Sequence, residues 1–254
     1  MKTILITGAL GWTATAIIQR LKQNNARLIG VDLPDVPLSP DITPYFDTLI
    51  RGDIADFQQV DRAMQGVDAV VHLAVALGNA YGTPDLPFAT NVKGTYNVFE
   101  AARQHAIEKV ILMSSAPVHL FPLDKRPFRA GTDWQSSSDG DYLYDLTKRL
   151  QEEIARDFCQ TFGMNSIVLR AGHIVDGRAE KDPKGSPLSE VVYCRGGWVC
   201  RYDLATACAQ ALHQTLPGYN AYHVIGAWQA RDMFEVEKTE QALGFQFQTR
   251  FEAY

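Results

Sequence analysis

The sequence predicts an α/β fold built on a doubly wound parallel sheet, and two observations predict it. Short apolar runs rich in β-branched residues alternate with longer amphipathic stretches along most of the 254 residues. A glycine-containing turn, TGALGWTA at 7–14, joins the first run to the first amphipathic stretch. This alternation is typical of right-handed crossovers between parallel strands, so we expect helices on both faces of one sheet.

The predicted strands are short runs without a polar face, as strands covered by helices on both sides must be. The first, KTILIT, ends in Thr-Gly, and the second, RLIGVD, ends in Asp32. In chain order the predicted strands are residues 2–7, 27–32, 48–54, 68–74, 109–115, 165–172 and 221–226.

The predicted helices carry apolar residues at helical spacing, as in the first of them, where Ala14, Ile17 and Leu21 share one face. Gly66 and Gly163 are expected to end two others, because glycine favours the position after a helix. In chain order the predicted helices are residues 11–25, 57–66, 87–106, 144–163 and a last one from about Tyr202 to 214.

Two stretches interrupt this alternation. Residues 33–47 hold four prolines and are expected to form a loop. Residues 176–197 are polar and rich in glycine and proline, which indicates an excursion near the site. We therefore expect one domain, 1–254, with a small C-terminal substrate lobe contributed by about 172–200 and 226–254.

Composition narrows the class of partner. The chain is 46% hydrophobic and 21% charged, with a formal net charge of -5 and no dominating basic cluster, which argues against nucleic acid and favours a small-molecule substrate. The four cysteines form no C-x-x-C pair, so we expect neither a metal site nor a disulfide framework. We expect no membrane span and no cleavable leader, hence a cytoplasmic protein.

The turn at 7–14 is suited to a dinucleotide. Gly8 and Gly11 let the backbone turn sharply and approach a pyrophosphate, and the following helix offers free N–H groups and the positive end of its dipole. The alternative is a tight strand-to-helix turn without a ligand. Asp32 favours the ligand, because a carboxylate at this strand end can accept hydrogen bonds from the adenosine ribose hydroxyls and would repel a 2′-phosphate. This predicts NAD over NADP.

Other residues at the strand ends are open to two interpretations. Asp53 could bind the adenine amino group or cap the next helix. Parallel strands place their carboxyl ends along one rim, where ligands bind. The sequence places Thr7–Gly8, Asp32, Asp53, Ala74 and Ser114–Ser115 there.

These motifs, in this order, resemble the extended short-chain dehydrogenase/reductases, the NAD-dependent epimerase/dehydratase superfamily. The resemblance covers about residues 3–205 and implies a Rossmann-type fold. The stations that carry it are TGALGWTA, Asp32, GDI at 52–54, HLA at 72–74, NVKGTYN at 91–97, SSAPV at 114–118, Y-x-x-x-K at 144–148 and RAG at 170–172. The cofactor-binding residues expected from the turn, the rim and the resemblance are Gly8, Leu10, Gly11, Trp12, Asp32, Asp53, Ile54, Leu73, Ala74, Val75, Asn91, Tyr144, Lys148 and Ala171.

The segment DYLYDLTKRL holds two tyrosines upstream of one lysine. Tyr144 and Lys148 are four apart and share a helical face, whereas Tyr142 is six residues from Lys148 and does not. A nearby ammonium favours the phenolate, so Tyr144 can act as a general acid/base. An exposed helical pair without chemistry is the alternative. The resemblance implies that Lys148 also holds the nicotinamide ribose.

The resemblance also assigns supporting residues. The Ser-Ser-x-x-Val pattern selects Ser115 over Ser114 to orient the reacting oxygen, so the expected catalytic residues are Ser115, Tyr144 and Lys148. Asn91 would brace the central helix and relay protons through water, or act structurally alone. The substrate-binding candidates are Ser115, Ala116, His119, His173 and Arg201. The alternative is a satisfied loop histidine for His119 and a surface ion pair for Arg201, and the resemblance implies that His173 lies near the nicotinamide. Arg170 could hold a carboxylate or support a loop, and Asp203 is expected to cap the helix after Trp198.

Fewer than ninety residues follow Arg170, whereas the superfamily's sugar-nucleotide enzymes are longer, so we expect a substrate without a nucleotide handle. The chain is similar to the uronate and related sugar dehydrogenases. The first hypothesis is an NAD-dependent dehydrogenase of a small sugar, sugar acid or polyol. The second is an epimerase, dehydratase or lyase-type enzyme that retains NAD, and the third a non-catalytic NAD sensor. The superfamily often dimerises through the helix after Asn91 and the Tyr-x-x-x-Lys helix, and a homodimer stays open.

Overall fold

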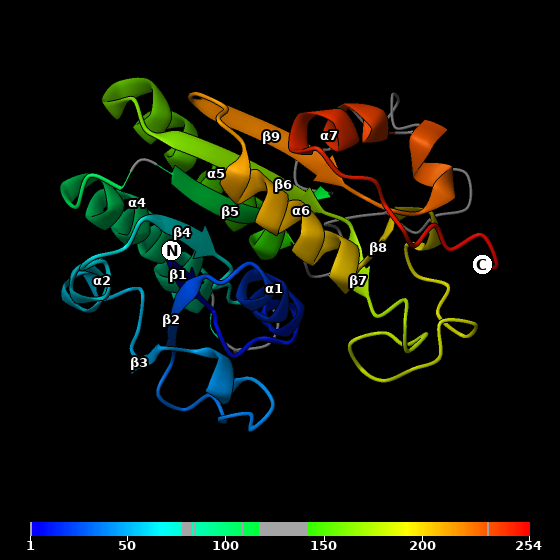
Figure 1. Ribbon diagram of the computed structural model, residues 1–254, viewed down its shortest axis with the longest axis horizontal. Helices are drawn as coiled ribbons and strands as arrows, with labels where there is room; N and C mark the ends of the chain where they lie inside the picture. Colours follow the sequence, from blue (N-terminus) through cyan, green and yellow to red (C-terminus); the bar gives the residue numbers. More distant parts are fainter. Residues whose placement is uncertain (1, 78–82, 84, 108, 117–141, 233) are drawn as a thin grey trace.

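The computed structural model describes residues 2–77, 83, 85–107, 109–116, 142–232 and 234–254. Its centre is a sheet in the order β3-β2-β1-β4-β5-β6-β9, in which every neighbouring pair is parallel (Figure 1). The strands are β1 (Thr3–Thr7), β2 (Arg27–Asp32), β3 (Thr48–Arg51), β4 (Ala69–His72), β5 (Lys109–Ser115), β6 (Asn165–Ala171) and β9 (Tyr219–Val224). This confirms the predicted Rossmann-type parallel sheet.

Helices cover both faces of the sheet (Figure 1). Strand side chains alternate between two cores, as in β1, where Ile4 and Ile6 join one cluster and Leu5 the other. The first core includes α1, α6 and α7, and the second includes α2, α4 and α5. The helices are α1 (Trp12–Gln23), α2 (Phe57–Ala63), α3 (Asp85–Pro87), α4 (Gly94–Gln104), α5 (Tyr142–Phe162), α6 (Arg201–His213) and α7 (Val236–Leu243).

The helix predicted over 87–106 is divided in the structure. A short turn, α3, leads into a π-helix, η2 (Phe88–Lys93), before α4 begins at Gly94. Asn91 is fully buried in the π-helical segment, and π-helical turns are frequent at functional sites. The prediction of one regular helix here was therefore wrong in form.

The polar excursion is bracketed by a second, two-stranded sheet that the sequence did not predict. β7 (His173–Val175) pairs in parallel with β8 (Trp198–Cys200), so the two ends of 176–197 lie side by side. The residues before β7 and β8 approach each other closely at Gly172, where an added Cβ would lie 2.0 Å from the carbonyl oxygen of Gly197. Single-turn 3-10 segments complete the described fold: η1 (Thr43–Tyr45), η7 (Arg195–Gly197) and η8 (Trp228–Asp232).

Two smaller expectations are also corrected. α5 begins at Tyr142, two residues before the predicted start. Asp203 does not cap α6: the cap position is Cys200, which makes no side-chain capping bond, and Asp203 instead accepts a hydrogen bond from the Thr249 N–H at 2.9 Å. Asp203 thus ties α6 to the C-terminal segment.

The described residues contain no helix that is long and apolar enough to cross a bilayer. Within the same residues, no three His, Cys, Asp or Glu side chains gather as a metal site. The cysteines Cys159, Cys194, Cys200 and Cys208 are all buried as free thiols.

Candidate active site

The predicted dinucleotide turn lies between β1 and α1. Gly8 has a φ of +66°, and a Cβ there would approach the backbone N and Cα of Ala74 to 2.8 Å. Only glycine satisfies both conditions, because other residues resist this φ and would collide with the end of β4. Gly11 precedes α1 without a side-chain capping bond, so no side chain at that position competes for the helix's first N–H groups. The turn therefore fits a pyrophosphate.

Asp32 braces this turn at the end of β2. Its Oδ2 accepts from the Leu10 N–H at 2.7 Å and its Oδ1 from the Leu33 N–H at 2.9 Å. A carboxylate has about four acceptor sites, so both oxygens can still accept ribose hydroxyls. Asp32 thus holds the turn and presents an anion beside it.

The other rim residues follow the same edge. Leu73, Ala74 and Val75 follow β4 and are half-buried. Asp53 does not cap the next helix, since α2 is capped by Asp56, whose side chain accepts from the Gln58 and Gln59 N–H groups.

Asp53 instead closes its own turn by accepting from the Ala55 N–H at 2.8 Å. The adjacent Ile54 is buried, and its carbonyl accepts from the Asn97 amide. This excludes the capping alternative for Asp53 and leaves adenine binding as a proposal.

Tyr144 and Lys148 come together one turn apart on α5. The Lys148 Nζ lies 5.9 Å from the centroid of the Tyr144 ring and donates to the Met113 carbonyl on β5 at 2.8 Å. Lys148 is only 3% exposed, and this burial lowers its pKa to about 7, while the charge of Glu152 opposes the fall. The structure therefore places a buried cation beside the predicted phenol.

The two serines that end β5 differ in their surroundings. Ser114 is buried, and its hydroxyl donates to the Glu152 carboxylate at 2.5 Å. Ser115 is half-buried and pairs in register with Ala171 at the ends of β5 and β6. Since the Ser114 hydroxyl already donates to Glu152, this geometry favours Ser115 as the hydroxyl that would orient the reacting oxygen of a substrate. Ala116 follows it and is buried.

Asn91 connects the cofactor rim to α5. Its Oδ1 accepts from the Ala76 N–H at 2.7 Å, and its Nδ2 donates to the Ala76 carbonyl and to the Thr147 hydroxyl, each at 2.9 Å. Thr147 immediately precedes Lys148. Asn91 thus braces α5 against the chain that follows β4, and its predicted proton relay and cofactor contact stay predictions.

A network of buried polar side chains, which the sequence did not predict, runs from the carboxyl end of β1 to α5. The His72 ring contacts the Thr7 hydroxyl at 2.6 Å and the Thr95 hydroxyl at 2.9 Å, and the Gln151 amide donates to Thr95 at 2.6 Å. Burial lowers the pKa of His72 to about 3, with a smaller contribution from Lys148, so the ring is neutral. This network links the end of β1 to α5.

Two strand pairings place the described substrate candidates: Ser115 pairs with Ala171, two residues before His173, and β7 pairs with β8, which ends one residue before Arg201. His119 lies outside the described residues. His173 is half-buried at the start of β7, and its ring meets the edge of Tyr193 with 5.2 Å between centroids. Burial lowers the pKa of His173, opposed by Asp182. Tyr193 belongs to the excursion and was missed because an isolated loop tyrosine carries no pattern.

Arg201 faces the dinucleotide turn. Its guanidinium stacks over the Trp12 indole at 4.1 Å and donates to the Trp12 carbonyl at 2.6 Å, and Nη1 lies 3.8 Å from the Asp176 carboxylate. Substrate recognition by Arg201 stays a prediction, because these contacts tie it to the turn and to the excursion. Arg170 pairs with Glu152 at 2.7 Å, so it supports the interior.

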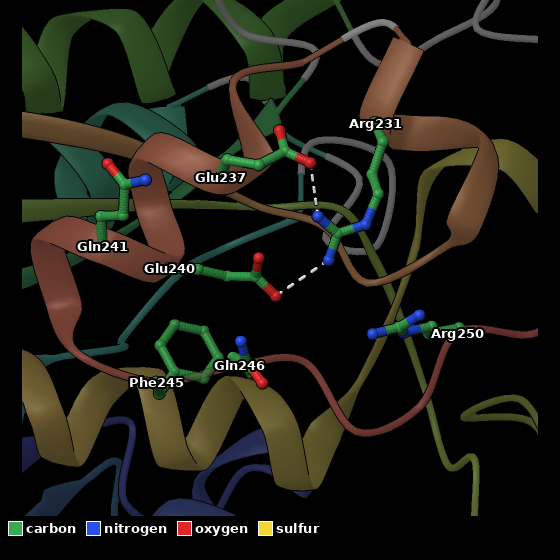
Figure 2. Close-up of a pocket in the computed structure, with 7 residues that line it drawn as sticks. All are labelled: Arg231, Glu237, Glu240, Gln241, Phe245, Gln246 and Arg250. Carbon is green, nitrogen blue, oxygen red and sulfur yellow. Dashed lines mark hydrogen bonds and ion pairs between the residues drawn. The ribbon is translucent and has the colours of Figure 1, made fainter.

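A cavity of about 500 Å³ lies elsewhere, on α7 and the C-terminal segment. Figure 2 shows Arg231 directed toward Glu237 and Glu240, with which it pairs. Arg250 lies below Arg231 at the right of this view. None of the residues that line this cavity is among the predicted site residues. The cavity is therefore distinct from the candidate site at the strand ends.

A glycine turn braced by an acidic strand end, with a tyrosine and a lysine on a helix across the same sheet, defines a Rossmann-type dinucleotide-binding protein. The chain belongs to the NAD dependent epimerase/dehydratase family, whose model matches residues 4–189. The family and fold inferred from the sequence are confirmed, and the expected NAD cofactor agrees with this membership.

Several proteins of named activity are similar to the chain. Uronate dehydrogenases of Pseudomonas putida and Agrobacterium fabrum are 28% and 30% identical over 171 and 173 residues, which is 66% and 68% of this chain but only 60% and 61% of theirs. The L-arabinose 1-dehydrogenase (NAD(P)(+)) of Haloferax volcanii is 24% identical over 261 residues, 96% of each chain.

Solved structures show the same fold. A uronate dehydrogenase from Agrobacterium tumefaciens complexed with NAD superposes with a TM-score of 0.73 at 22% identity, covering 100% of this chain and 87% of that one. The UDP-glucose 4-epimerase of Thermus thermophilus with NAD gives a TM-score of 0.68 at 22% identity, covering 96% and 84%. At these identities the likeness concerns the fold alone.

Proposed function

We propose that the chain is an NAD-dependent dehydrogenase of a small sugar or sugar acid that carries no nucleotide, with Tyr144 as general acid/base. The observation that carries the proposal is the pairing of Tyr144 with a buried Lys148 on α5, across the sheet from a turn that fits a pyrophosphate. The similarity to uronate and arabinose dehydrogenases supports the substrate class.

The chain's own residues would divide the work as follows. Gly8, Gly11 and Asp32 would hold the dinucleotide, which when bound supplies a hydride acceptor. Tyr144 would take the proton of the substrate hydroxyl, and Ser115 would orient the same oxygen. The Lys148 ammonium favours the phenolate form of Tyr144, because an adjacent cation lowers the cost of the negative charge.

The test is a screen of the purified protein with NAD against uronic acids, aldoses and polyols. Stoichiometric accumulation of reduced cofactor with a sugar or sugar acid is the expected result. Conversion of a sugar without net reduction of NAD would instead indicate the epimerase/dehydratase alternative. Binding of NAD without any turnover would favour the sensor alternative, against which the retained Tyr144 and Lys148 argue.

Asp32 is expected to set the preference for NAD over NADP. In Asp32→Asn the KM for NAD should rise about tenfold, since a hydrogen bond to a charged group contributes roughly 1.5–3 kcal/mol. The discrimination against NADP should fall, because the anion that repels a 2′-phosphate is gone. Steady-state kinetics with both cofactors measure this. Asp35→Asn is the matched control, an exposed carboxylate on the following loop, and should change neither value.

We also propose a homodimer through α4 and α5. Tyr96 on α4 and Phe162 on α5 are 49% and 50% exposed, and both rings pack against Phe158. Large aromatic rings exposed together mark interaction surfaces. Sedimentation velocity should give twice the chain mass, and Tyr96→Glu should shift the protein to monomer. A monomeric wild-type protein at micromolar concentration would contradict this proposal.

A further inference from the structure

A buried carboxylate lies one helical turn beyond Lys148. Glu152 on α5 is 0% exposed. Three side chains from three strands donate to it: the Ser114 hydroxyl from β5 at 2.5 Å, the Arg170 guanidinium from β6 at 2.7 Å and the Tyr219 hydroxyl from β9 at 2.6 Å. Because each of these groups donates, Glu152 is held as an anion that accepts from all of them.

The donors are themselves fixed in their donating forms. Burial raises the pKa of Tyr219, and the neighbouring Glu152 raises it further, so the phenol keeps its proton. Arg170 contacts both carboxylate oxygens, Nε reaching Oε1 at 3.1 Å and Nη2 reaching Oε2 at 2.7 Å. A fork of this kind orients a carboxylate as well as neutralising it.

Glu152 is placed to act on Lys148. The two residues are four apart on α5 and therefore share its inner face. Their side chains reach adjacent residues of β5, Lys148 the Met113 carbonyl and Glu152 the Ser114 hydroxyl. Burial lowers the pKa of Lys148, and Glu152 is the charge that opposes this.

Other titratable side chains near Lys148 come from α5 and from three strands of the sheet. Tyr144 lies beside Lys148 on α5, and Asp145 is a second buried carboxylate on that helix. His72 on β4 is neutral, as its lowered pKa shows. Arg170 on β6 and Tyr219 on β9 are both engaged with Glu152.

We propose that Glu152, held by Ser114, Arg170 and Tyr219, is a positioning residue that keeps Lys148 charged and docked on β5 beside Tyr144. The inference rests on the proposed function for its catalytic consequence, though not for its electrostatic one. A cation buried to this extent loses its proton more easily, and the lysine can assist the tyrosine only while it stays charged.

The direct test follows Lys148 itself. Protein labelled with ¹³C at the lysine ε-carbon is titrated by NMR, with the Lys148 signal assigned by its loss in Lys148→Met. In Glu152→Gln the Lys148 midpoint should fall by about one pH unit, because the charge that opposes the effect of burial is removed. Glu153→Gln is the matched control: the same change one residue on, at a side chain 56% exposed and paired with Arg156, which should leave the midpoint unmoved.

The kinetic readout is the pH profile of kcat/KM, which reports ionisations of the free enzyme. Activity needs Lys148 protonated, so the alkaline limb should move to lower pH in Glu152→Gln by the shift seen in the NMR titration. A uniform loss of activity at every pH, with the limb unmoved, would show a merely structural role and overturn the proposal.

Glu152→Gln leaves Arg170 without its partner and could fail to fold. The double variant Glu152→Gln/Arg170→Met removes both charges, and replacing a whole buried ion pair is often tolerated. Its Lys148 midpoint should still fall, by less than in the single variant. A wild-type midpoint in the folded double variant overturns the inference.

The two proposals fail separately. If no sugar is oxidised by the wild-type protein but the Lys148 midpoint shifts as stated, the proposed function is wrong and the role of Glu152 stands. If turnover is found but the midpoint does not move, the inference about Glu152 is wrong alone.

Discussion

Tyr144→Phe should abolish turnover while leaving NAD affinity within about twofold. The phenol oxygen is the only heavy atom lost, and proton transfer by a positioned side chain typically contributes about 10²–10⁴-fold in rate. The Lys148 ammonium and the turn around Gly8 remain in place, so the dinucleotide should bind as before. Single-turnover formation of reduced cofactor measures the first quantity, and calorimetric titration with NAD measures the second.

Tyr142→Phe is the matched control for this variant. It removes the same kind of hydroxyl at a residue six positions before Lys148 rather than four, a spacing for which the sequence predicts no shared helical face. Its kcat should stay within a few-fold of wild type. Retained activity in Tyr144→Phe, or loss of activity in Tyr142→Phe alone, would reverse the assignment of the two tyrosines.

Gly172→Ala should produce a large loss of stability. The added methyl would lie 2.0 Å from the Gly197 carbonyl oxygen and 3.2 Å from Ile225, so β7 and β8 could not keep their separation. Overpacking of this kind costs roughly 1–3 kcal/mol and occasionally more, and backbone cannot move aside as a side chain can. Thermal unfolding should show a midpoint lower by about 5–10 °C, using roughly 2–4 °C per kcal/mol for a chain of this size.

Gly52→Ala is the control for this loss. A Cβ at Gly52 would approach 2.7 Å, but the atom it meets is the Oε1 of Gln59, at the end of a flexible side chain. Moving this side chain breaks its hydrogen bonds with the Asp53 N–H and the Asp56 carboxylate but displaces no backbone, so the unfolding midpoint should fall by less than in Gly172→Ala. Equal losses in both variants would mean that the contact with Gly197 is not what makes Gly172 necessary.

The sheet and the glycine turn at its edge could be predicted from the sequence because their signals are local. The strands at 27–32 and 109–115 were predicted to the residue, since each is an apolar run bounded by turn signals. The four-residue spacing of Tyr144 and Lys148 sufficed to place them on one helical face. Gly8 predicts the turn because only glycine tolerates its positive φ and its close approach to the Ala74 backbone.

The remaining features depend on tertiary contacts that carry no local pattern. β7 and β8 are three residues each, too short for a periodicity to show. Asp203 has the sequence context of a helix cap, but the distant Thr249 N–H captures its carboxylate. In the sequence Glu152 resembles any charged helix residue, because its three donors come from the distant strands β5, β6 and β9.

The stack of Arg201 on Trp12 provides the molecule with its own optical reporter. The indole lies at the first residue of α1, directly after Gly11, with a guanidinium 4.1 Å above its ring. A dianionic pyrophosphate arriving at this turn would alter the field across the indole and therefore the wavelength and yield of its emission. Of the other tryptophans that the structure describes, Trp198 is fully buried in the core and Trp228 is half exposed near the C-terminal segment, so neither lies on the phosphate turn. Trp134 lies outside the described residues, and a Trp134→Phe variant would remove its contribution to the emission. Loading of the nucleotide could thus be followed by ultraviolet fluorescence with no substrate present.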